Sequence, residues 1–500
     1  MMKVHRISLL VLIISLVFFW VTPMSASAET TYTFTGGGKG HAVGLCMSGV
    51  LYAANQGLNY NQILPHYYTG VTIGARGGVD ASLIRAKVYS AAWAFGVKGN
   101  GTYQVKNSSG TVIKSLLSGS TITVTYKGGG TYEIKSQTQG TCTVTGGMVN
   151  LEPLTTTKFT FPNGLSYQGK IRVVVPTNEG VTAVNILSID SYLKGLAEEP
   201  DSWPTQGLQT LAIASRTYAY RRTITNASSS YDIDNNGLYY IGVRTAPNYA
   251  KAVNDTRDVI ITYQGSPITA AYSGSCGGHT ENIEDVWGGS PVAYLKARPC
   301  NWCKTIKWYR WGPLTYSKSR LEAIFKSHGV DVGSLIDIDI SNRSAGGHVR
   351  KARIIGTAKT VTVWGYSQLG SWLAFYPGVN SSLYWISKSG STPSPGTSPT
   401  PSKISTASSK LYAARRVVKI KQPFGLTFNT NPPIARAHIF VRRRVIGIKK
   451  WGRYRKYRTH PRGFINLVGR IDKSSVYEFY YPGNRTYKGV RKRLVVRVKR

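Results

Sequence analysis

The sequence predicts an α+β fold, in which a strand-rich domain with few helices is followed by a small all-β, sandwich-like domain. Residues 75–180 alternate apolar and polar side chains between clusters of Gly, Ser and Thr, which is the pattern of half-buried strands. Helical spacing of apolar residues is confined to a few stretches. The last 90 or so residues alternate again between turn residues, as in small β-sandwiches.

The elements follow in chain order. Helices are expected near 45–56, 204–223 and 318–328, and strands return at 259–263, 348–355 and 360–364. Beyond residue 410, strands are expected at 417–421, 440–446 and 494–499, with turns at 431–433 and 482–484. Many strands with few helices between them are typical of an α+β protein.

The chain of 500 residues is long enough for two or three domains. Residues 1–28 have the plan of a secretory signal peptide, with Lys3 and Arg6, an apolar run, and small residues at the end. A retained membrane anchor is the alternative, which the shortness of the run disfavours. We therefore expect a signal peptide at 1–28, a main domain at 29–388, a linker rich in Pro, Ser and Thr at 389–409, and a strongly basic β domain at 410–500.

Glu198 stands in a loop directly ahead of the second expected helix. Pro204 suits the first turn of that helix, and Asp201 and Ser202 are candidate caps before it. Apolar and small residues then recur at helical spacing, so one face of the helix is expected to be buried. Arg216 lies at the edge of that face, where a guanidinium group can pair with a carboxylate. The sequence thus predicts an acid held by a scaffold.

The run YLKGLAEEPDSWP, followed by LAIASRTYAYRR, resembles the central signature of the SpoIID/LytB family of bacterial wall proteins. That signature has a YL-x-G-V run, a Glu-x-Pro, a Ser-Trp-Pro and an Ala-Arg-Thr-Tyr-Ala helix. Here Leu196 replaces the Val and Ser215 the first Ala. Glu198, two residues before Pro200, matches the family's catalytic position, and Glu199 does not. The resemblance covers roughly residues 32–388.

Two further stretches resemble the family. SGSCGGHT at 273–280 is similar to its Ser-Gly-Gly-x-Thr loop, which a Trp follows, here Trp287. GKGHAVGLCMS at 38–48 is similar to its Gly-His-Gly-Val-Gly-Leu-Ser-Gln motif, with Ala42, Cys46 and Met47 as departures. The segment after Ser230 lacks the His and Cys with which some relatives hold zinc. As substrate-binding residues of the implied site we expect Arg216, Tyr218, Tyr272, Ser275, Gly277, Gly278 and Thr280.

Five cysteines, at positions 46, 142, 276, 300 and 303, leave at least one unpaired if the others form disulfides. Cys276-Gly-Gly-His279 with Cys300-Asn-Trp-Cys303 has a spacing that suits a tetrahedral zinc site. An exported chain meets oxidising conditions, which favour a disulfide from Cys276 to Cys300 or Cys303. We therefore expect that disulfide and no bound metal, with the zinc site as the alternative.

The resemblance implies a lytic transglycosylase that acts on peptidoglycan glycan strands without a cofactor, with Glu198 as general acid and then base. Such an acid needs a raised pKa, for which Leu196 and Trp203 are the expected apolar neighbours. One carboxyl group suffices for this reaction, unlike the pair that ordinary glycosidases use. The alternative is a non-catalytic wall-binding enhancer of a wall amidase, and a third hypothesis is a purely structural surface protein.

Residues 410–500 contain 26 Lys and Arg against two acids, Asp472 and Glu478, in a chain of net charge +40. Nucleic acid is a common target of such charge, but an exported protein rarely meets it, so none is expected as a partner. Anionic wall polymers present the same electrostatic target. An unspecialised soluble surface is the alternative. The sequence therefore predicts a secreted, cell wall-associated protein.

Overall fold

The computed structural model describes residues 29–374, 378–389, 409–413, 417–419, 423–430, 437–448, 450–459, 464–482 and 489–499. The chain divides into two compact units, residues 1–391 and 392–500. The expected signal peptide, nearly all of the expected linker, the turn at 431–433 and most of the turn at 482–484 lie outside the described residues. The finer domain boundaries remain predictions.

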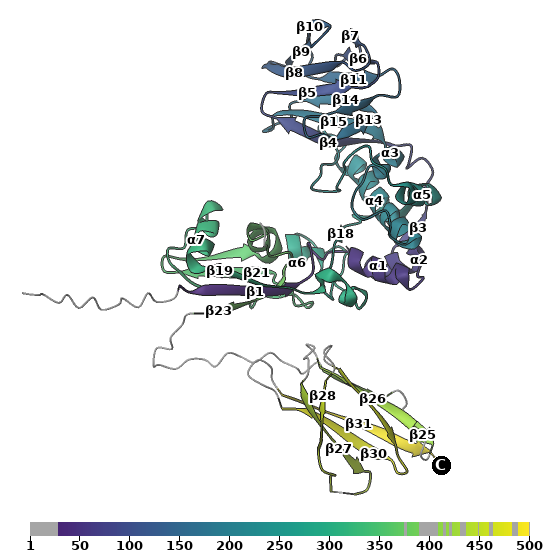
Figure 1. Ribbon diagram of the computed structural model, residues 1–500, viewed down its shortest axis with the longest axis vertical. Coiled ribbons are helices and arrows are strands. Elements are labelled where there is room, and N and C mark those ends of the chain that lie inside the picture. The colour runs from purple at the N-terminus through teal and green to yellow at the C-terminus, as the bar shows by residue number, and fades with distance from the viewer. Residues whose placement is uncertain are drawn as a thin grey trace, which may run out of the picture. The chain divides into compact units, whose positions relative to one another are not determined.

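Two six-stranded antiparallel sheets form a strand-rich lobe of the first unit (Figure 1). One sheet has the order β10 (Gly140–Val144), β9 (Thr131–Ser136), β8 (Thr121–Gly128), β5 (Ala94–Gly99), β12 (Lys158–Thr160), β13 (Ser166–Gln168). The other has the order β4 (Leu83–Ala91), β15 (Val181–Ser188), β14 (Lys170–Val174), β11 (Val149–Pro153), β6 (Tyr103–Lys106), β7 (Val112–Leu116). Burial alternates along most of these strands, and Phe159 and Tyr167 lie in the core. The strands expected between 75 and 180 are confirmed.

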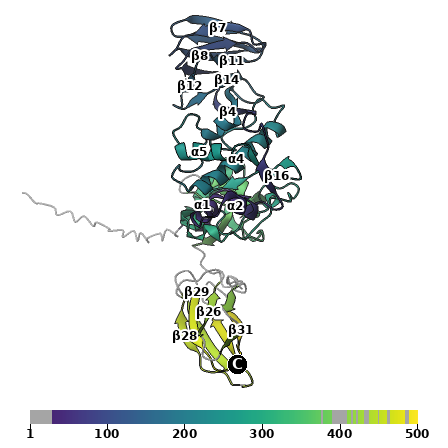
Figure 2. The ribbon, with the colours of Figure 1, turned by 90° about the vertical axis from the view of Figure 1, so that its right-hand side faces the viewer.

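Helix α4 (Thr205–Thr225) is the centre of the adjoining helical region. It packs against α1 (Met47–Asn55), α2 (Tyr60–Tyr67), α3 (Ile189–Lys194), α5 (Pro247–Asp255) and β16 (Val259–Tyr263). Strand β16 lies between β17 (Ser266–Pro267) and β3 (Thr72–Ala75) in a small sheet. Figures 1 and 2 show α4 next to β4 at the edge of the strand-rich lobe. The expectation of one buried face is too narrow, since residues 210–217 are buried without interruption.

The rest of the first unit has its own core, which includes Phe34, Leu321 and Phe325. It contains the sheet β19 (Trp311–Ser317), β1 (Thr31–Gly37), β23 (Leu383–Lys388) and the sheet β20 (Leu335–Asp339), β21 (Lys351–Gly356), β22 (Thr360–Trp364). Its helices are α7 (Lys318–Ser327) and a π-helix (Gly365–Gly370). The remaining elements are β2 (Leu45–Cys46), β18 (Tyr272–Ser273), α6 (Ile283–Trp287) and 3-10 turns at Trp302–Thr305 and Lys307–Tyr309. Strands β1 and β23, from opposite ends of the unit's sequence, pair side by side.

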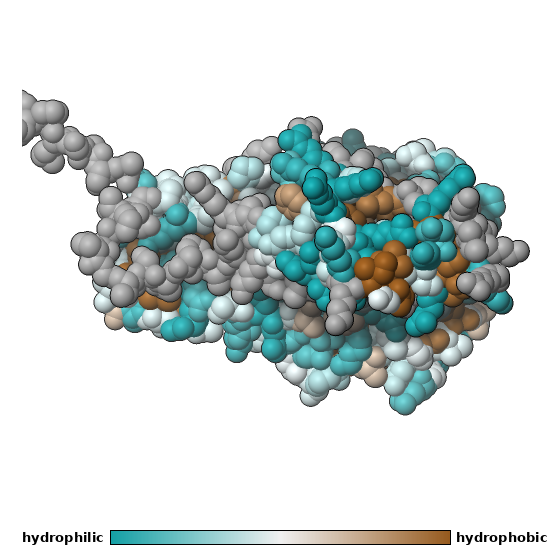
Figure 3. All heavy atoms as spheres, turned by 90° about the horizontal axis from the view of Figure 1, so that it is seen from below, coloured by the Kyte–Doolittle hydropathy of each residue, from teal (hydrophilic) through white to brown (hydrophobic). Residues whose placement is uncertain are grey.

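The second unit is all-β in its described residues. One sheet has the order β24 (Lys410–Ala413), β26 (Pro423–Asn429), β29 (Phe464–Arg470). The other has β25 (Val417–Lys419), β31 (Val490–Lys499), β30 (Ser475–Tyr481), β27 (His438–Val445), β28 (Arg455–Arg458). Phe428 of the first sheet and Phe479 of the second are fully buried, with ring centroids 5.6 Å apart. This packing of two sheets confirms the sandwich-like prediction. On the face drawn in Figure 3, hydrophilic residues prevail and hydrophobic ones form small separate groups.

The α+β class is confirmed, and the helices expected near 45–56, 204–223 and 318–328 correspond to α1, α4 and α7. The strand expected at 348–355 begins only at Lys351. Four short helices were not predicted: α2, α3, α5 and α6. Helix α2 contains Pro65, which disguises it in the sequence, and a capping box between Asn59 and Gln62 starts it.

A buried ion pair fixes α4 to the chain around it. The Nε atom of Arg216 donates to Asp80 Oδ1 at 2.6 Å, and both side chains are at most 1% exposed. Arg216→Ala should lower the free energy of unfolding by about 3–5 kcal/mol, because it leaves the Asp80 charge buried without its partner. Urea denaturation measures this loss. The control is Lys251→Ala, which removes an exposed pair with Asp255 and should cost under about 1 kcal/mol; equal losses in the two variants would contradict the prediction.

Candidate functional site

The loop that carries Glu198 is held in place by a backbone ladder. Leu196 forms a bridge with Tyr240, the Ala197 amide donates to the Tyr239 carbonyl at 2.9 Å, and the Ile241 amide donates to the Gly195 carbonyl at 3.0 Å. Residue 195 must be glycine, since a Cβ there would lie 2.4 Å from the Tyr240 ring. The loop backbone is therefore held by strand-like hydrogen bonds to residues 239–241.

Glu198 is partly buried at the end of this ladder. Its Oε1 atom accepts a hydrogen bond of 2.7 Å from the Tyr239 amide. Burial raises the pKa of its carboxyl group above the ordinary value, while hydrogen bonds from the Tyr239 amide and the Tyr272 hydroxyl pull it down in part. Burial raises the pKa values of three surrounding phenols, Tyr192, Tyr249 and Tyr272, and the charge of Glu198 raises each of them further. The site is thus a carboxyl group enclosed by tyrosines.

Glu199 is a second partly buried carboxyl group in the same loop. Burial, and next the negative charge of Glu198, raise its pKa to about 7, against a smaller opposing effect of Lys39. The two neighbouring carboxyl groups therefore resist being charged together. Both can hold a proton at higher pH than a free Glu, but only Glu198 receives the hydrogen bonds from Tyr239 and Tyr272.

Two expectations about this region need correction. Arg216 is fully buried and its Nε atom pairs with Asp80, so it neither orients Glu198 nor reaches a substrate. Asp201 does not cap α4, whose first residue follows Pro204 without a side-chain cap. Its carboxylate instead accepts from the Tyr249 amide at 2.7 Å and thereby caps α5. Asp201 thus fixes Tyr249, one of the tyrosines around Glu198.

The Gly-rich loop is mostly buried, which corrects its expected role in substrate contact. Ser275 is fully buried and exchanges backbone hydrogen bonds with Lys39. Thr280 is 1% exposed and its hydroxyl accepts from the Arg298 amide at 2.8 Å. Gly277 and Gly278 adopt positive φ values, and only Gly278 is partly exposed. These polar groups already have partners inside the protein, so the loop is better described as a support.

Aromatic side chains provide the surface that the Gly-rich loop does not. Tyr272 is partly buried and its hydroxyl lies 3.2 Å from Ser215 Oγ, while Tyr218 is also partly buried. Trp287 is 43% exposed and its ring centroid lies 4.8 Å from that of His41. His41 accepts from the Val43 amide, and burial lowers its pKa to about 4. A neutral histidine under an exposed tryptophan is a suitable platform for a sugar ring.

Four of the five cysteines come together. The sulfur atoms of Cys46, Cys276, Cys300 and Cys303 lie within 4.8 Å of one another, and all four residues are buried. All five cysteines of the chain are described and are free thiols, so the expected disulfide from Cys276 to Cys300 or Cys303 is not present. The sequence pointed to three members of this cluster but not to Cys46, because 230 residues separate it from Cys276 in the chain.

Neighbours of the Glu198 loop, and one acid that follows the Gly-rich loop, had no functional signal in the sequence. Tyr239 contributes through its amide, which every residue type except proline has, and Tyr249 lies 51 positions from Glu198. Glu281 follows the Gly-rich loop and is 1% exposed, and burial raises its pKa to about 7. Its Oε1 atom lies 3.9 Å from Nε2 of the buried His348. Only the fold brings these groups together.

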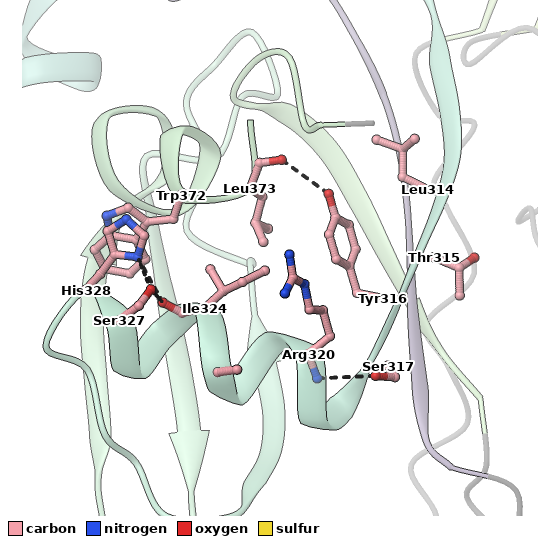
Figure 4. A pocket seen from close by; sticks show the side chains of 11 residues that line it. Leu314, Thr315, Tyr316, Ser317, Arg320, Ile324, Ser327, His328, Trp372 and Leu373 are labelled. Carbon is pink, nitrogen blue, oxygen red and sulfur yellow. Dashed lines mark hydrogen bonds between the residues drawn. The ribbon is translucent and has the colours of Figure 1, made fainter. Parts of the chain in front are cut away.

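A hollow of about 690 Å³ lies elsewhere in the first unit, between β19, α7 and residues 372–373 (Figure 4). The rings of His328 and Trp372 stack at its rim, 5.0 Å apart, and Arg320 points into it. No carboxyl group is among the described residues that line it, and none of them surrounds Glu198. The candidate site is therefore the tyrosine-enclosed loop, whose residues do not line this hollow.

The fold and site define a strand-rich α+β protein that holds a partly buried loop carboxyl group at the start of a buried helix. The family model SpoIID, described as stage II sporulation protein, matches residues 177–263, which include that loop and helix. The matched model and the relatives named below support the SpoIID/LytB family for this part of the chain.

Similar proteins match only part of the chain. An uncharacterised protein of Brachyspira hyodysenteriae is 36% identical over 27% of this chain and 37% of its own length. The amidase enhancer of Bacillus subtilis is 37% identical over 26% of this chain and 17% of its own. Stage II sporulation protein D of Bacillus amyloliquefaciens is 28% identical over 24% of this chain and 41% of its own length. The chain thus spans less than half the length of each of these relatives. Among its described helices, none is long and apolar enough to cross a membrane.

Proposed function

We propose that this chain is an exported cell-wall protein that cleaves peptidoglycan glycan strands as a lytic transglycosylase, with Glu198 as the general acid and base. The observation that carries the proposal is the setting of Glu198, a partly buried carboxyl group that the Tyr239 amide holds in a tyrosine-lined loop, where burial raises its pKa. The matched family model and the names of the relatives, which refer to sporulation and to an amidase enhancer, support a role at the wall.

The chemistry needs one carboxyl group. Protonated Glu198 donates its proton to the oxygen that bridges N-acetylmuramic acid and N-acetylglucosamine, and the bond from muramic C1 to that oxygen breaks. The Glu198 carboxylate then takes the proton of the muramic 6-hydroxyl group, and the oxygen of that hydroxyl group bonds to C1. The products are a 1,6-anhydro end and a free glucosamine end, with no water consumed. Trp287, which is 43% exposed and lies beside His41, is our candidate for stacking on a sugar ring.

A non-catalytic amidase enhancer is the second candidate. The 37% identity to the Bacillus subtilis amidase enhancer favours it, and so does the buried Gly-rich loop, which offers few polar groups to a glycan. In that case the partner is a wall amidase and Glu198 has a structural role. Digestion of purified glycan strands separates the two: mass spectrometry should find anhydro-muramic ends with this chain alone. Their appearance only when an amidase is present would support the enhancer.

The pH dependence of cleavage should report on Glu198. A general acid works only when protonated, so cleavage should fall as pH rises through the raised pKa of Glu198. Tyr272→Phe removes a hydrogen bond that lowers this pKa, so the fall in kcat should move to higher pH. Initial rates across a pH series measure the shift.

The matched control is Tyr249→Phe, which removes another buried phenol near Glu198. That phenol is not among the groups that shift the pKa of Glu198, so the profile should keep its position. A Tyr272→Phe profile that moves to lower pH, or that coincides with the control, would argue against Glu198 as the titrating acid.

A further inference from the structure

A compact cluster of four cysteines joins three parts of the chain that are distant in sequence. Cys46 ends strand β2, Cys276 lies in the Gly-rich loop, and Cys300 and Cys303 flank the start of the 3-10 turn at 302–305. All four side chains are 0% exposed. Free cysteine is often buried singly, but four sulfur atoms that converge on one point need a common explanation.

The geometry fits a tetrahedral metal ion. Four thiolates about 2.3 Å from a zinc ion lie about 3.8 Å from one another. The sulfur atoms of Cys276 and Cys303 are 3.6 Å apart, and all four lie within 4.8 Å of one another. The C-x2-C spacing of Cys300 and Cys303 is also typical of zinc sites. We infer that Cys46, Cys276, Cys300 and Cys303 form a structural zinc site with four cysteine ligands.

The surroundings suit thiolate ligands. The Cys276 amide donates to the sulfur atom of Cys46 at 3.2 Å, and the Tyr67 hydroxyl lies 3.3 Å from that of Cys300. Such donors stabilise the negative charge of metal-bound sulfur. Residue 49 must be small here, because a Cβ at Gly49 would lie 1.9 Å from the Tyr67 oxygen and 3.1 Å from the Cys300 sulfur.

His279 is not a ligand, although its spacing to Cys276 suggested one. Its Nδ1 atom lies 2.7 Å from the Thr280 carbonyl oxygen, and the fourth position of the cluster is filled by Cys46. Four protein ligands leave no open position for water or substrate, which is the arrangement of structural rather than catalytic zinc.

The zinc site would hold the strand that carries Tyr272, a neighbour of Glu198. Strand β2 pairs in parallel with β18, with Cys46 opposite Ser273 and Leu45 opposite Tyr272. Tyr272 is the residue whose hydroxyl lowers the pKa of Glu198. A metal bound by Cys46 and Cys276 therefore fixes both strands on the side of the candidate site, whether or not the chain cleaves glycan.

Metal analysis of the full chain tests the inference. Protein purified without added metal should contain about one zinc ion per chain, as measured by elemental mass spectrometry. Cys46→Ser should lose nearly all of it, and Cys142→Ser, which changes the cysteine outside the cluster, should keep it. After denaturation with a chelator and no reductant, alkylation should modify all five cysteines of the wild-type protein.

Metal analysis and alkylation of the wild-type protein alone can overturn the assignment. The test therefore does not depend on whether the Cys46→Ser variant folds. Absence of stoichiometric metal, together with cysteines that react only after reduction, would show disulfides in place of the zinc site. Stoichiometric iron in place of zinc would overturn the choice of metal, and zinc retained by Cys46→Ser would exclude Cys46 as a ligand.

Discussion

Glu198→Gln should abolish glycan cleavage while leaving the fold and glycan binding intact. The amide has nearly the shape of the acid and can still accept from the Tyr239 amide, but it cannot donate a proton to the glycosidic oxygen. General acid catalysis contributes roughly 10²- to 10⁴-fold, and the same residue must also act as base, so kcat should fall at least this far. The assay counts anhydro-muramic ends released from purified glycan strands.

Glu199→Gln is the matched control, because it changes the neighbouring carboxyl group in the same loop. Burial, and next the negative charge of Glu198, raise the pKa of Glu199 to about 7. A large fraction of the protein molecules therefore already has a neutral Glu199 near pH 7. The variant should therefore cleave at close to the wild-type rate. Near wild-type cleavage by Glu198→Gln would refute the proposed mechanism. A large loss in Glu199→Gln alone would transfer the role of the acid to Glu199.

Local patterns predicted the scaffold of this site well. The Glu-x-Pro run and the helix after it were visible because a loop, a proline and apolar spacing are encoded by adjacent residues. Alternation likewise revealed the strands of both units. Helix α5 escaped because its cap, Asp201, comes from 46 positions before its first residue, Pro247.

The partners of buried charged and reactive groups could not be read from the sequence. Arg216 sits on α4 near Glu198 in the chain, yet its ion pair is with Asp80, 136 positions away. Cys46 joins Cys276 only because β2 and β18 pair in parallel. Each of these contacts depends on how distant elements pack, which no spacing along one segment encodes.

Binding of the whole chain to Gram-positive-type walls should weaken steeply with salt. In the second unit the buried Glu478 accepts from Arg442 at 2.8 Å and from Arg493 at 2.6 Å, which orders two guanidinium groups next to Trp451. Arg493 nevertheless keeps 56% of its side chain exposed. If 6–10 such cations contact an anionic polymer, affinity should drop roughly 10³- to 10⁵-fold between about 50 and 200 mM salt, as ions replace the contacts. Sedimentation of purified walls at several salt concentrations measures the bound fraction.

A chain that ends at Ser391 should lose this salt-dependent binding and still cleave soluble glycan, because the second unit has its own core and the described partners of Glu198, Tyr239 and Tyr272, belong to the first unit. Arg493→Gln should weaken wall binding and reduce its salt dependence, since it removes one exposed cation from residues 410–500, in which 26 basic residues stand against two acids. Lys251→Gln, which removes an exposed cation of the first unit, is the matched control and should bind as the wild type does. Binding that stays equally strong at high salt, or that favours neutral glycan over anionic polymer, would mean that the second unit recognises carbohydrate by shape and hydrogen bonding, and the electrostatic proposal would have to be abandoned.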